Sequence, residues 1–431
     1  MRIYDYEAAF GAGDKTTKAM KEAIAEWFRL YYGDRAGEDS DPSQRIAYTV
    51  VNKIVKAMFG EYQATASDPA QQALVDRLDA VRKQAVQLAL VGGECYMKPC
   101  PEGNRFQFTL IPRDQVLVFG RDPDGCPNDM GMLERSVYGN AYYTLLERRW
   151  LDADGCLCME NKLYRSGDGS ALGSQVSLGE HPAYAHLPER YRYPQPLGGL
   201  GLVRMKTPML NCVDGSHDGV AVFAPVAELI HNIDRNEAQL SGEFSRGESR
   251  LVVSRDLLSD NQLRDNLFVA LDEDPEQVGM TVFSPQLRYE AYLARKQEYL
   301  RNVESVVGLR RGMLTDVNMD ERTATEITSS AGDFNLTVIE FQKMWQTAHR
   351  EVLQLCCQLA QMYAMAYPKA VEVSIDWGNS TLYDEDKLWE QYRQMAEDGL
   401  IAPEVALGWR FGLPSATEEE RKIIRSRYMA E

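Results

Sequence analysis

The sequence contains no long apolar run. Its first seven residues, MRIYDYE, lack the apolar core of a secretory signal peptide. No later stretch approaches the roughly 18 consecutive apolar residues that a membrane-spanning helix needs. We therefore expect a cytoplasmic protein that makes no contact with a membrane.

Cysteine and histidine are scarce, with eight Cys and five His in 431 residues. This excludes a disulfide-dense scaffold, and the neighbours Cys356 and Cys357 would face different directions in a helix, so we expect free and mostly buried thiols. Cys156 and Cys158 lie in a predicted strand, where their side chains point to opposite faces and cannot share a metal ion. We predict no metal site.

Signatures of catalysis and phosphate binding are also missing. No segment matches G-x-x-x-x-G-K-[ST] or G-x-S-x-G. The glycines at 198–201 (GGLG) do not open a helix, which favours a flexible turn over a phosphate cradle. His217 and Asp218 could imitate a catalytic pair, but Asp218 fits better as the N-cap or a first-turn charge of the following helix. His181 and His186 have no partner at zinc spacing and are expected to be solvated loop residues.

Positive charge is in short supply. The chain has 47 Lys and Arg against 64 Asp and Glu, a formal charge of −17. Tight nucleic-acid binders usually have the opposite balance, because each Lys or Arg contact with a phosphate releases counterions. By itself, the charge indicates a soluble protein that repels polyanions. The length predicts two to four domains.

The hydrophobic periodicity of the first 200 residues predicts an α+β region. Helical spacing is found at 16–32, 44–59 and about 71–90. Strand-like segments separated by turn residues follow at 94–98, 106–111, 115–119, 132–138, 141–151, 156–164 and near Gln175. The segment 141–151 alternates as expected for a half-buried strand, and 179–201 indicates a long irregular connection.

The second half is dominated by helical patterns. Two helices, predicted at 218–246 and 285–307, flank an insertion of about 38 residues, and a polar interruption at 308–322 leads to a very long helix at 323–367. A strand is predicted at 370–377. Two acidic helices, at 384–398 and 417–430, are separated by a turn at Pro403.

The two helices that flank the insertion suggest a projecting stalk with the insertion at its tip. Aliphatic residues occupy more than one narrow stripe of these helices, so a stalk would need neighbours to cover its second apolar face. Oligomerisation into a ring is a common closed solution for such contacts. An ordinary helical subdomain remains the alternative.

An ordered set of segments, which together cover essentially the whole chain, points to a family. These segments are 91–98 (VGGECYMK), 110–116 (LIPRDQV), 214–216 (DGS) with 233–236 (IDRN), 249–253 (SRLVV) and 323–327 (TATEI). TATEI, which opens the long helix after a polar loop, is the most specific of them. In this order of segments the chain resembles the portal proteins of tailed double-stranded DNA phages, of the siphophage type.

The resemblance implies a ring-forming portal-protein fold, usually with twelve subunits, at one capsid vertex. It implies an α/β wing, a two-helix stem, a small α/β clip and a short helical crown. The boundaries it implies are 1–216 for the N-terminal wing, 217–247 for the first stem helix, 248–284 for the clip, 285–309 for the second stem helix, 310–322 for a tunnel loop, 323–377 for the long wing helix with its closing strand, and 378–431 for the crown.

The same resemblance directs attention to charged and polar residues of the stem, loop and clip. Gly312, Thr315 and Asn318 suit a mobile polar loop instead of a packed one. The candidates for facing the tunnel and DNA are Lys296, Arg301, Arg310, Arg311, Thr315 and Asn318, with an ion pair within or between subunits as the alternative for each basic residue. The candidates for docking at the clip are Asp272, Glu273, Asp274 and Glu276.

The functional hypothesis is a portal protein without catalytic activity or cofactor, a channel for packaging and ejection of the genome. Its expected partners are further copies of itself, double-stranded DNA, the terminase, the major capsid or scaffolding protein and head-completion proteins. We expect assembly in the host cytoplasm and a final place in the virion. The alternatives are a cytosolic protein-binding scaffold without a channel and an α+β enzyme with a site in the 94–149 sheet.

Within such a ring the acidic charge takes on a different meaning. A charge of −17 on each of twelve copies becomes about −200, which excludes tight and static binding of DNA but suits a channel through which DNA slides.

Overall fold

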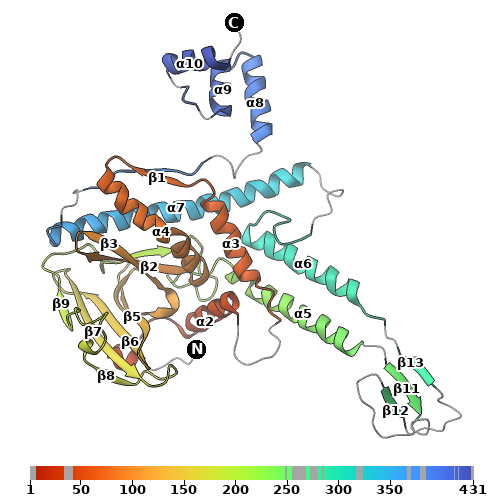
Figure 1. Cartoon of the computed structure of the whole chain (residues 1–431), viewed down its shortest axis with the longest axis horizontal. Coiled ribbons are helices and arrows are strands. Elements are labelled where there is room, and N and C mark those ends of the chain that lie inside the picture. Colours follow the sequence, from red (N-terminus) through yellow and green to blue (C-terminus); the bar gives the residue numbers. More distant parts are fainter. Residues whose placement is uncertain are drawn as a thin grey trace.

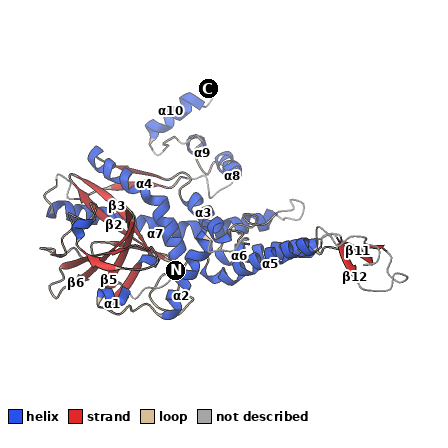
Figure 2. Cartoon of the chain, turned by 60° about the horizontal axis from the view of Figure 1, so that its bottom comes forward, coloured by secondary structure: helices blue, strands red, loops and turns tan. Residues whose placement is uncertain are grey.

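The computed structural model describes residues 6–33, 42–247, 250–254, 268–271, 280–283, 286–316, 324–365, 370–378, 385–411, 413–415 and 417–428. Figure 1 shows a body of sheets and helices from which two long helices project, with short strands at their far end. Three C-terminal helices lie apart from the body on another side. Figure 2 shows the same arrangement from a second direction, with the strands of the body gathered at one end.

The helices of the body follow the predicted apolar spacing. The first lies at Tyr6–Phe10 (α1), and the predicted ones are present at Lys18–Tyr32 (α2), Ile46–Met58 (α3) and Pro69–Gly92 (α4). Thr17 caps α2 by accepting a 3.2 Å hydrogen bond from the Met20 N–H. In α3 the stripe of Val50, Ile54 and Met58 is fully buried, so this helix forms the centre of the main core.

Antiparallel strands form the largest sheet, in the order β4-β5-β6-β7-β8, with β9 paired to β7. Its strands are Val116–Arg121 (β4), Pro127–Tyr138 (β5), Ala141–Leu151 (β6), Leu157–Ser166 (β7), Ser174–Val176 (β8) and Arg190–Arg192 (β9). A second sheet has the order β10-β2-β3 and consists of Glu94–Glu102 (β2), Arg105–Pro112 (β3) and Val203–Lys206 (β10).

Strand β6 differs from the half-buried strand that its alternation predicted, because both of its faces are covered. Tyr143 and Leu145 pack on one side against Tyr184, in the segment that follows β8. Leu146 packs on the other side against Phe10 of α1. Two layers that are distant in sequence therefore bury a strand whose pattern alone indicated one solvated face.

The two predicted helices of the second half form an antiparallel pair, which we call the stalk. They are Ala227–Arg246 (α5) and Tyr289–Val307 (α6). Between them lie Arg250–Ser254 (β11), Phe268–Leu271 (β12) and Met280–Phe283 (β13), in the order β12-β11-β13. Strand β11 is parallel to β12 and antiparallel to β13.

The first stalk helix begins later than the sequence predicts. Residues from Val220 to Phe223 are buried and extend through the body, and a short 3-10 turn at Ala224–Val226 precedes α5. The backbone here is bound by distant segments, since Val222 N–H donates to the Leu90 carbonyl at 2.9 Å and the Thr207 hydroxyl donates to the Val220 carbonyl at 2.8 Å. These contacts replace the helical bonds that the apolar spacing suggested.

The long helix is present at Ala324–Met362 (α7), and Trp345 at its centre is fully buried. It leads to Val373–Asp376 (β14), which pairs antiparallel with Gln63–Ala66 (β1). The C-terminal helices are Glu385–Glu397 (α8), Pro403–Arg410 (α9) and Glu418–Tyr428 (α10). The turn predicted at Pro403 is wrong: Pro403 opens α9, where its missing N–H costs nothing.

A buried charge cluster fixes the chain where it leaves the body for the stalk. Arg113 and Asp218 are each 2% exposed, and Asp218 Oδ1 accepts hydrogen bonds from Arg113 Nη2 at 3.0 Å and Arg121 Nη2 at 2.6 Å. The expectation that Asp218 caps a helix is therefore wrong. A carboxylate this deeply buried needs charged partners, and the arginines supply them.

Glu94 is the second carboxylate of this cluster and is completely buried. It pairs with Arg204, accepts a 2.7 Å bond from the Tyr96 hydroxyl and another of 2.7 Å from the Gly219 N–H. Burial alone would raise the pKa of Glu94, but the attraction of Arg204 and Arg113 and the hydrogen bonds lower it to about 2. The chain crosses itself here between two glycines, since a Cβ on Gly219 would overlap the Gly93 carbonyl oxygen.

We predict that Glu94→Gln lowers the free energy of unfolding at pH 7 by about 3 kcal/mol, because it leaves Arg204 without its counter-charge and Arg113 with Asp218 alone. The pKa of Glu94 is lower in the folded protein (about 2) than its ordinary value of 4.5, so its stabilising contribution is complete above pH 4.5 and is lost as the pH falls towards 2. Urea unfolding between pH 7 and 2.5 should thus show a shallower loss of stability for the variant.

Glu22→Gln is the matched control, because Glu22 is an exposed residue of α2 whose Oε1 lies 3.7 Å from Nζ of Lys18, which is also exposed. It should change the free energy of unfolding by less than about 0.5 kcal/mol. A Glu94→Gln variant as stable as the parent at pH 7 would contradict the role assigned to the cluster.

Candidate functional site

The tip of the stalk is held together by one carboxylate. Glu243 on α5 accepts hydrogen bonds from Arg288 through the backbone N–H at 2.9 Å, Nε at 3.2 Å and Nη2 at 3.0 Å. The hydrogen bonds from Arg288 lower the pKa of Glu243 to about 2. Phe244 and Tyr289 pack beside this pair, with ring centroids 6.0 Å apart.

Polar ties continue towards the base of the stalk. The buried Asn236 donates from Nδ2 to the Tyr292 carbonyl at 3.1 Å, which joins α5 to α6. Asp234 accepts a 2.8 Å bond from the Gln44 N–H, so α5 is also tied to the segment before α3. The predicted antiparallel stalk is therefore confirmed as an arrangement of this chain, with fixed register between its helices.

The two basic candidates on α6 have different surroundings. Lys296 Nζ lies 2.9 Å from Glu237 Oε2 on α5 and 2.8 Å from Gln44 Oε1, so it links three segments of the chain. Arg301 is about half exposed and lies 3.5 Å from Glu298, one turn earlier on the same helix.

The loop candidates are divided between described and undescribed residues. Arg310 and Arg311 are exposed, whereas Thr315 is buried and its hydroxyl donates to Glu304 Oε2 at 3.0 Å. The first part of the loop, through Asp316, is thus packed, contrary to the mobile segment expected for it. Asn318 and the clip candidates Asp272, Glu273, Asp274 and Glu276 lie outside the described residues.

The structure singles out Glu304, which the sequence presents as one more charge on a solvent-facing helix. Its side chain is 1% exposed and faces the core together with Leu300, Val303 and Val307. The signal in the sequence is its position: a glutamate inside an apolar stripe at helical spacing implies a buried carboxylate with partners of its own.

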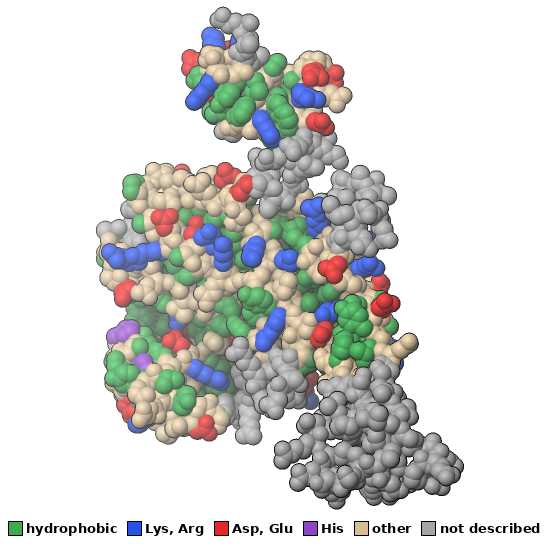
Figure 3. Space-filling model, turned by 45° about the vertical axis from the view of Figure 1, so that its right-hand side comes forward, with side chains coloured by type: hydrophobic (Ala, Val, Ile, Leu, Met, Phe, Trp, Pro, Cys, Tyr) green, Lys and Arg blue, Asp and Glu red, His purple; other side chains and the backbone are tan. Residues whose placement is uncertain are grey.

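The stalk exposes large apolar side chains as well as charges. Phe244 is 45% exposed, Tyr289 46%, Leu287 38% and Val306 55%. Figure 3 shows hydrophobic side chains gathered on the side of the stalk that faces the viewer. In the single chain, Phe244, Leu287 and Tyr289 form an uncovered apolar group at the tip of the stalk, and Val306 is exposed near the other end of α6. The apolar surface expected outside the stalk is therefore present at its tip, but not as one continuous face.

The histidines and the glycine-rich turn that were weighed as possible ligand sites do not form such sites in the described chain. His181 is buried among Tyr138, Tyr143 and Tyr184, with ring centroids 4.5–5.1 Å away, so the expectation of a solvated loop residue is wrong for it. His186 is exposed, as expected. At the glycine-rich turn, Arg149 Nη1 donates to the Leu200 carbonyl at 2.9 Å, so a carbonyl and not an N–H group points to the charged side chain there.

All eight cysteines lie in the described part of the chain and are free, as expected. Only half of them are buried, Cys356 and Cys357 among them, and Cys126 and Cys212 are exposed, so the expectation that most are buried is wrong. Cys156 is buried and Cys158 partly exposed. Among the residues that the structure describes, no group of three or more His, Cys, Asp and Glu side chains could hold a metal ion. In the same part of the chain, no helix is both long and apolar enough to cross a membrane.

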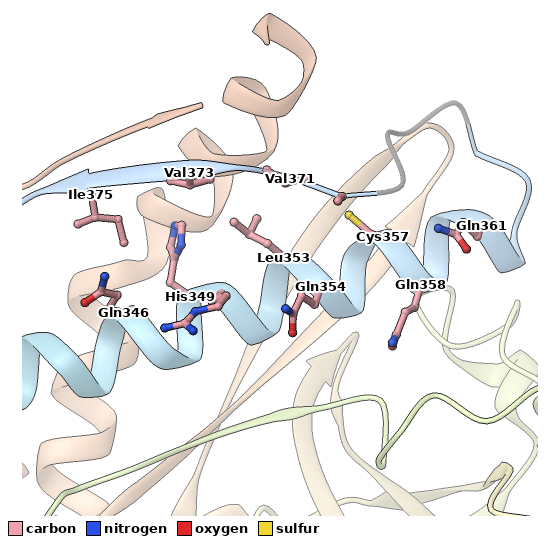
Figure 4. Close-up of a pocket in the computed structure, with 12 residues that line it drawn as sticks. Gln346, His349, Leu353, Gln354, Cys357, Gln358, Gln361, Val371, Val373 and Ile375 are labelled. Atoms are coloured by element: carbon pink, nitrogen blue, oxygen red, sulfur yellow. The ribbon is translucent and has the colours of Figure 1, made fainter. Parts of the chain in front are cut away.

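A groove of about 440 Å³ runs between α7 and β14. Figure 4 shows glutamine side chains from α7, Gln346, Gln354 and Gln358 among them, along one side, with Val373 and Ile375 of β14 on the other. Burial lowers the pKa of His349 to about 4, so its ring is neutral at pH 7. Burial also raises the pKa of the Cys357 thiol, which leaves this candidate nucleophile of the lining unactivated.

One comparison with known proteins gave a match of nearly full length. The family model described as phage portal protein, SPP1 Gp6-like, matches residues 18–424. No curated protein matches the chain.

We predict that Lys296→Met lowers the free energy of unfolding by about 1 kcal/mol, because it removes a charged hydrogen bond between the two stalk helices while keeping the length of the side chain. Arg301→Met is the matched control on the same helix, since its ion pair is exposed and links residues one turn apart; we expect a change below about 0.5 kcal/mol. Urea unfolding of both variants measures the difference. Equal effects would mean that Lys296 does not act as a tie.

Proposed function

Because the chain belongs to the family of SPP1 Gp6-like phage portal proteins, we propose that its copies assemble into a ring at one vertex of a phage capsid. Double-stranded DNA would pass through the central channel of this ring during packaging and ejection. The ring is a conduit, with no catalytic step of its own, and a separate ATP-driven terminase moves the DNA.

The observation that carries this proposal, beyond the family, is the uncovered stalk. Two helices project from the body with large apolar side chains exposed, Phe244, Leu287 and Tyr289 among them. Exposed apolar surface of this kind marks a surface for association. Stalks packed side by side around an axis would cover it, and the repeated contact between neighbours closes into a ring. From the resemblance to phage portal proteins, we expect twelve copies.

Charge supports a channel in which DNA slides. Each copy carries −17, so the ring as a whole would repel the phosphate backbone. Arg301, Arg310 and Arg311 are our candidates for brief contacts with phosphates, since these residues lie at the surface of the stalk or of the loop that follows it. Lys296 is instead assigned to the tie between the stalk helices, and Thr315 to the packing of the loop.

The proposed partners follow from the proposed parts. The insertion at 248–284, with Asp272, Glu273, Asp274 and Glu276, would be the clip that docks the terminase and later the head-completion proteins. Residues 378–431 would be a short crown that faces the capsid interior, and the body would contact the major capsid or scaffolding protein. Assembly would take place in the host cytoplasm and end in the virion.

Electron microscopy of the purified full chain in negative stain tests this proposal. We expect rings with a central hole at one or more salt concentrations, because covering the apolar face of each stalk favours the closed assembly. Ring classes with a defined number of copies would support it.

Monomers or compact dimers at every salt concentration would contradict the proposal. A closed assembly without a hole would instead favour a protein-binding scaffold, the alternative that lacks a channel.

A further inference from the structure

The connection that follows α6 turns back along the helix it has just left. Gly308 ends α6 in the left-handed conformation, with φ of 76°, and Leu309 N–H donates to the Glu304 carbonyl at 2.8 Å. A tight turn follows, in which Met313 N–H donates to the Arg310 carbonyl at 3.1 Å. The chain then lies beside α6 until Asp316.

The carboxylate of Glu304 accepts several hydrogen bonds from this returning segment. Glu304 Oε1 accepts hydrogen bonds from the N–H groups of Gly312 at 3.0 Å, Leu314 at 2.5 Å and Thr315 at 3.1 Å. Its other oxygen, Oε2, accepts the Thr315 hydroxyl at 3.0 Å. The carboxylate is 1% exposed, so these four bonds take the place of water around a buried charge.

A second contact fixes the far end of the returning segment. Asp316 N–H donates to Gln297 Oε1 at 3.1 Å, and Gln297 Nε2 donates to Asp316 Oδ2 at 3.2 Å. Gln297 lies about two helical turns before Glu304, along the same face of α6. Two polar side chains of α6 therefore hold the segment in register along the helix.

We infer that Glu304 is a positioning residue that holds residues 308–316 against the stalk and thereby sets the place of Arg310 and Arg311. This inference rests on the proposed function, in which these two arginines meet DNA in the channel. The four donors to Glu304 are three backbone N–H groups and a hydroxyl, so its charge fixes the backbone of the loop. A backbone held in this way fixes the points from which Arg310 and Arg311 leave the loop, so that less chain entropy is lost when DNA arrives.

Amide hydrogen exchange of the full chain tests the anchor itself. In Glu304→Ala we expect exchange at Gly312, Leu314 and Thr315 to rise about tenfold or more, because their acceptor is gone. In Glu304→Gln we expect a rise below about threefold, since the amide oxygen can still accept the N–H groups while its NH₂ donates to the Thr315 hydroxyl.

Glu298→Ala is the matched control, because Glu298 is an exposed glutamate of α6 that pairs with Arg301 on the same helix. Exchange at 312, 314 and 315 should be unchanged in it. If Glu304→Ala does not fold, Thr315→Val removes the hydroxyl bond to the same carboxylate and should raise exchange in this segment alone. Unchanged exchange at these amides in Glu304→Ala, or in Thr315→Val where the alanine variant does not fold, would overturn the inference.

DNA binding tests the consequence for the arginines. The slope of log affinity against log salt for double-stranded DNA decreases in magnitude by about one for each phosphate that the protein no longer binds. Glu304→Ala should lower this slope as much as the double substitution of Arg310→Ala and Arg311→Ala, and Glu304→Gln should keep the slope of the parent. A parental slope in Glu304→Ala despite faster exchange would overturn the positioning role.

The two proposals fail in different ways. If no ring forms, the proposed function fails, while hydrogen exchange on the single chain still reports on the anchor. If rings form and the amides at 312, 314 and 315 exchange in Glu304→Ala as in the parent, the inference alone fails.

Discussion

Charged side chains are buried at the junction of body and stalk. Because each of them needs a partner of opposite charge, they constrain the positions of the segments that meet there. Arg113 lies between Glu94 and Asp218 in an apolar interior, where a charge without a partner costs several kcal/mol. The cluster draws its members from β2, the turn between β3 and β4, β4, β10 and the segment that leads into α5. A shift of any one of these segments would remove a partner from a buried charge, so the direction in which the stalk leaves the body is fixed before α5 begins.

The same principle operates at the end of α6. Glu304 occupies a position in an apolar stripe, and the cost of burying it is offset only because the chain returns and donates four hydrogen bonds. Along the stalk, Asn236, Lys296 and the pair of Glu243 with Arg288 fix the register of α5 and α6. The polar residues thus fix the positions of the stalk helices and of the loop that follows them. The exposed apolar residues of the stalk provide a surface for association with other copies.

The wrong predictions for Asp218 and His181 share one physical cause. Asp218 precedes a helical pattern, which predicts a local role as a cap, but its arginine partners lie about 100 residues away in sequence. His181 has no neighbour in sequence that suggests burial, yet three tyrosines from the sheet and its own loop surround it. The local sequence pattern indicates the propensity of a segment to form a helix, a strand or a loop. It does not show which residues from other segments the fold places next to a given side chain.

Periodicity and composition were enough to predict the longer helices, most strands of the largest sheet, the stalk as a helical pair and the free thiols, because these are properties of short windows of the chain. The short elements β1, β10 and α9 were missed. The burial of Asp218, the identity of the four donors to Glu304, the link that Lys296 makes between α5 and α6 and the covering of β6 on both faces became visible only in the folded chain. Those outcomes depend on contacts between segments far apart in sequence, since a charge is buried only where distant residues supply its partners.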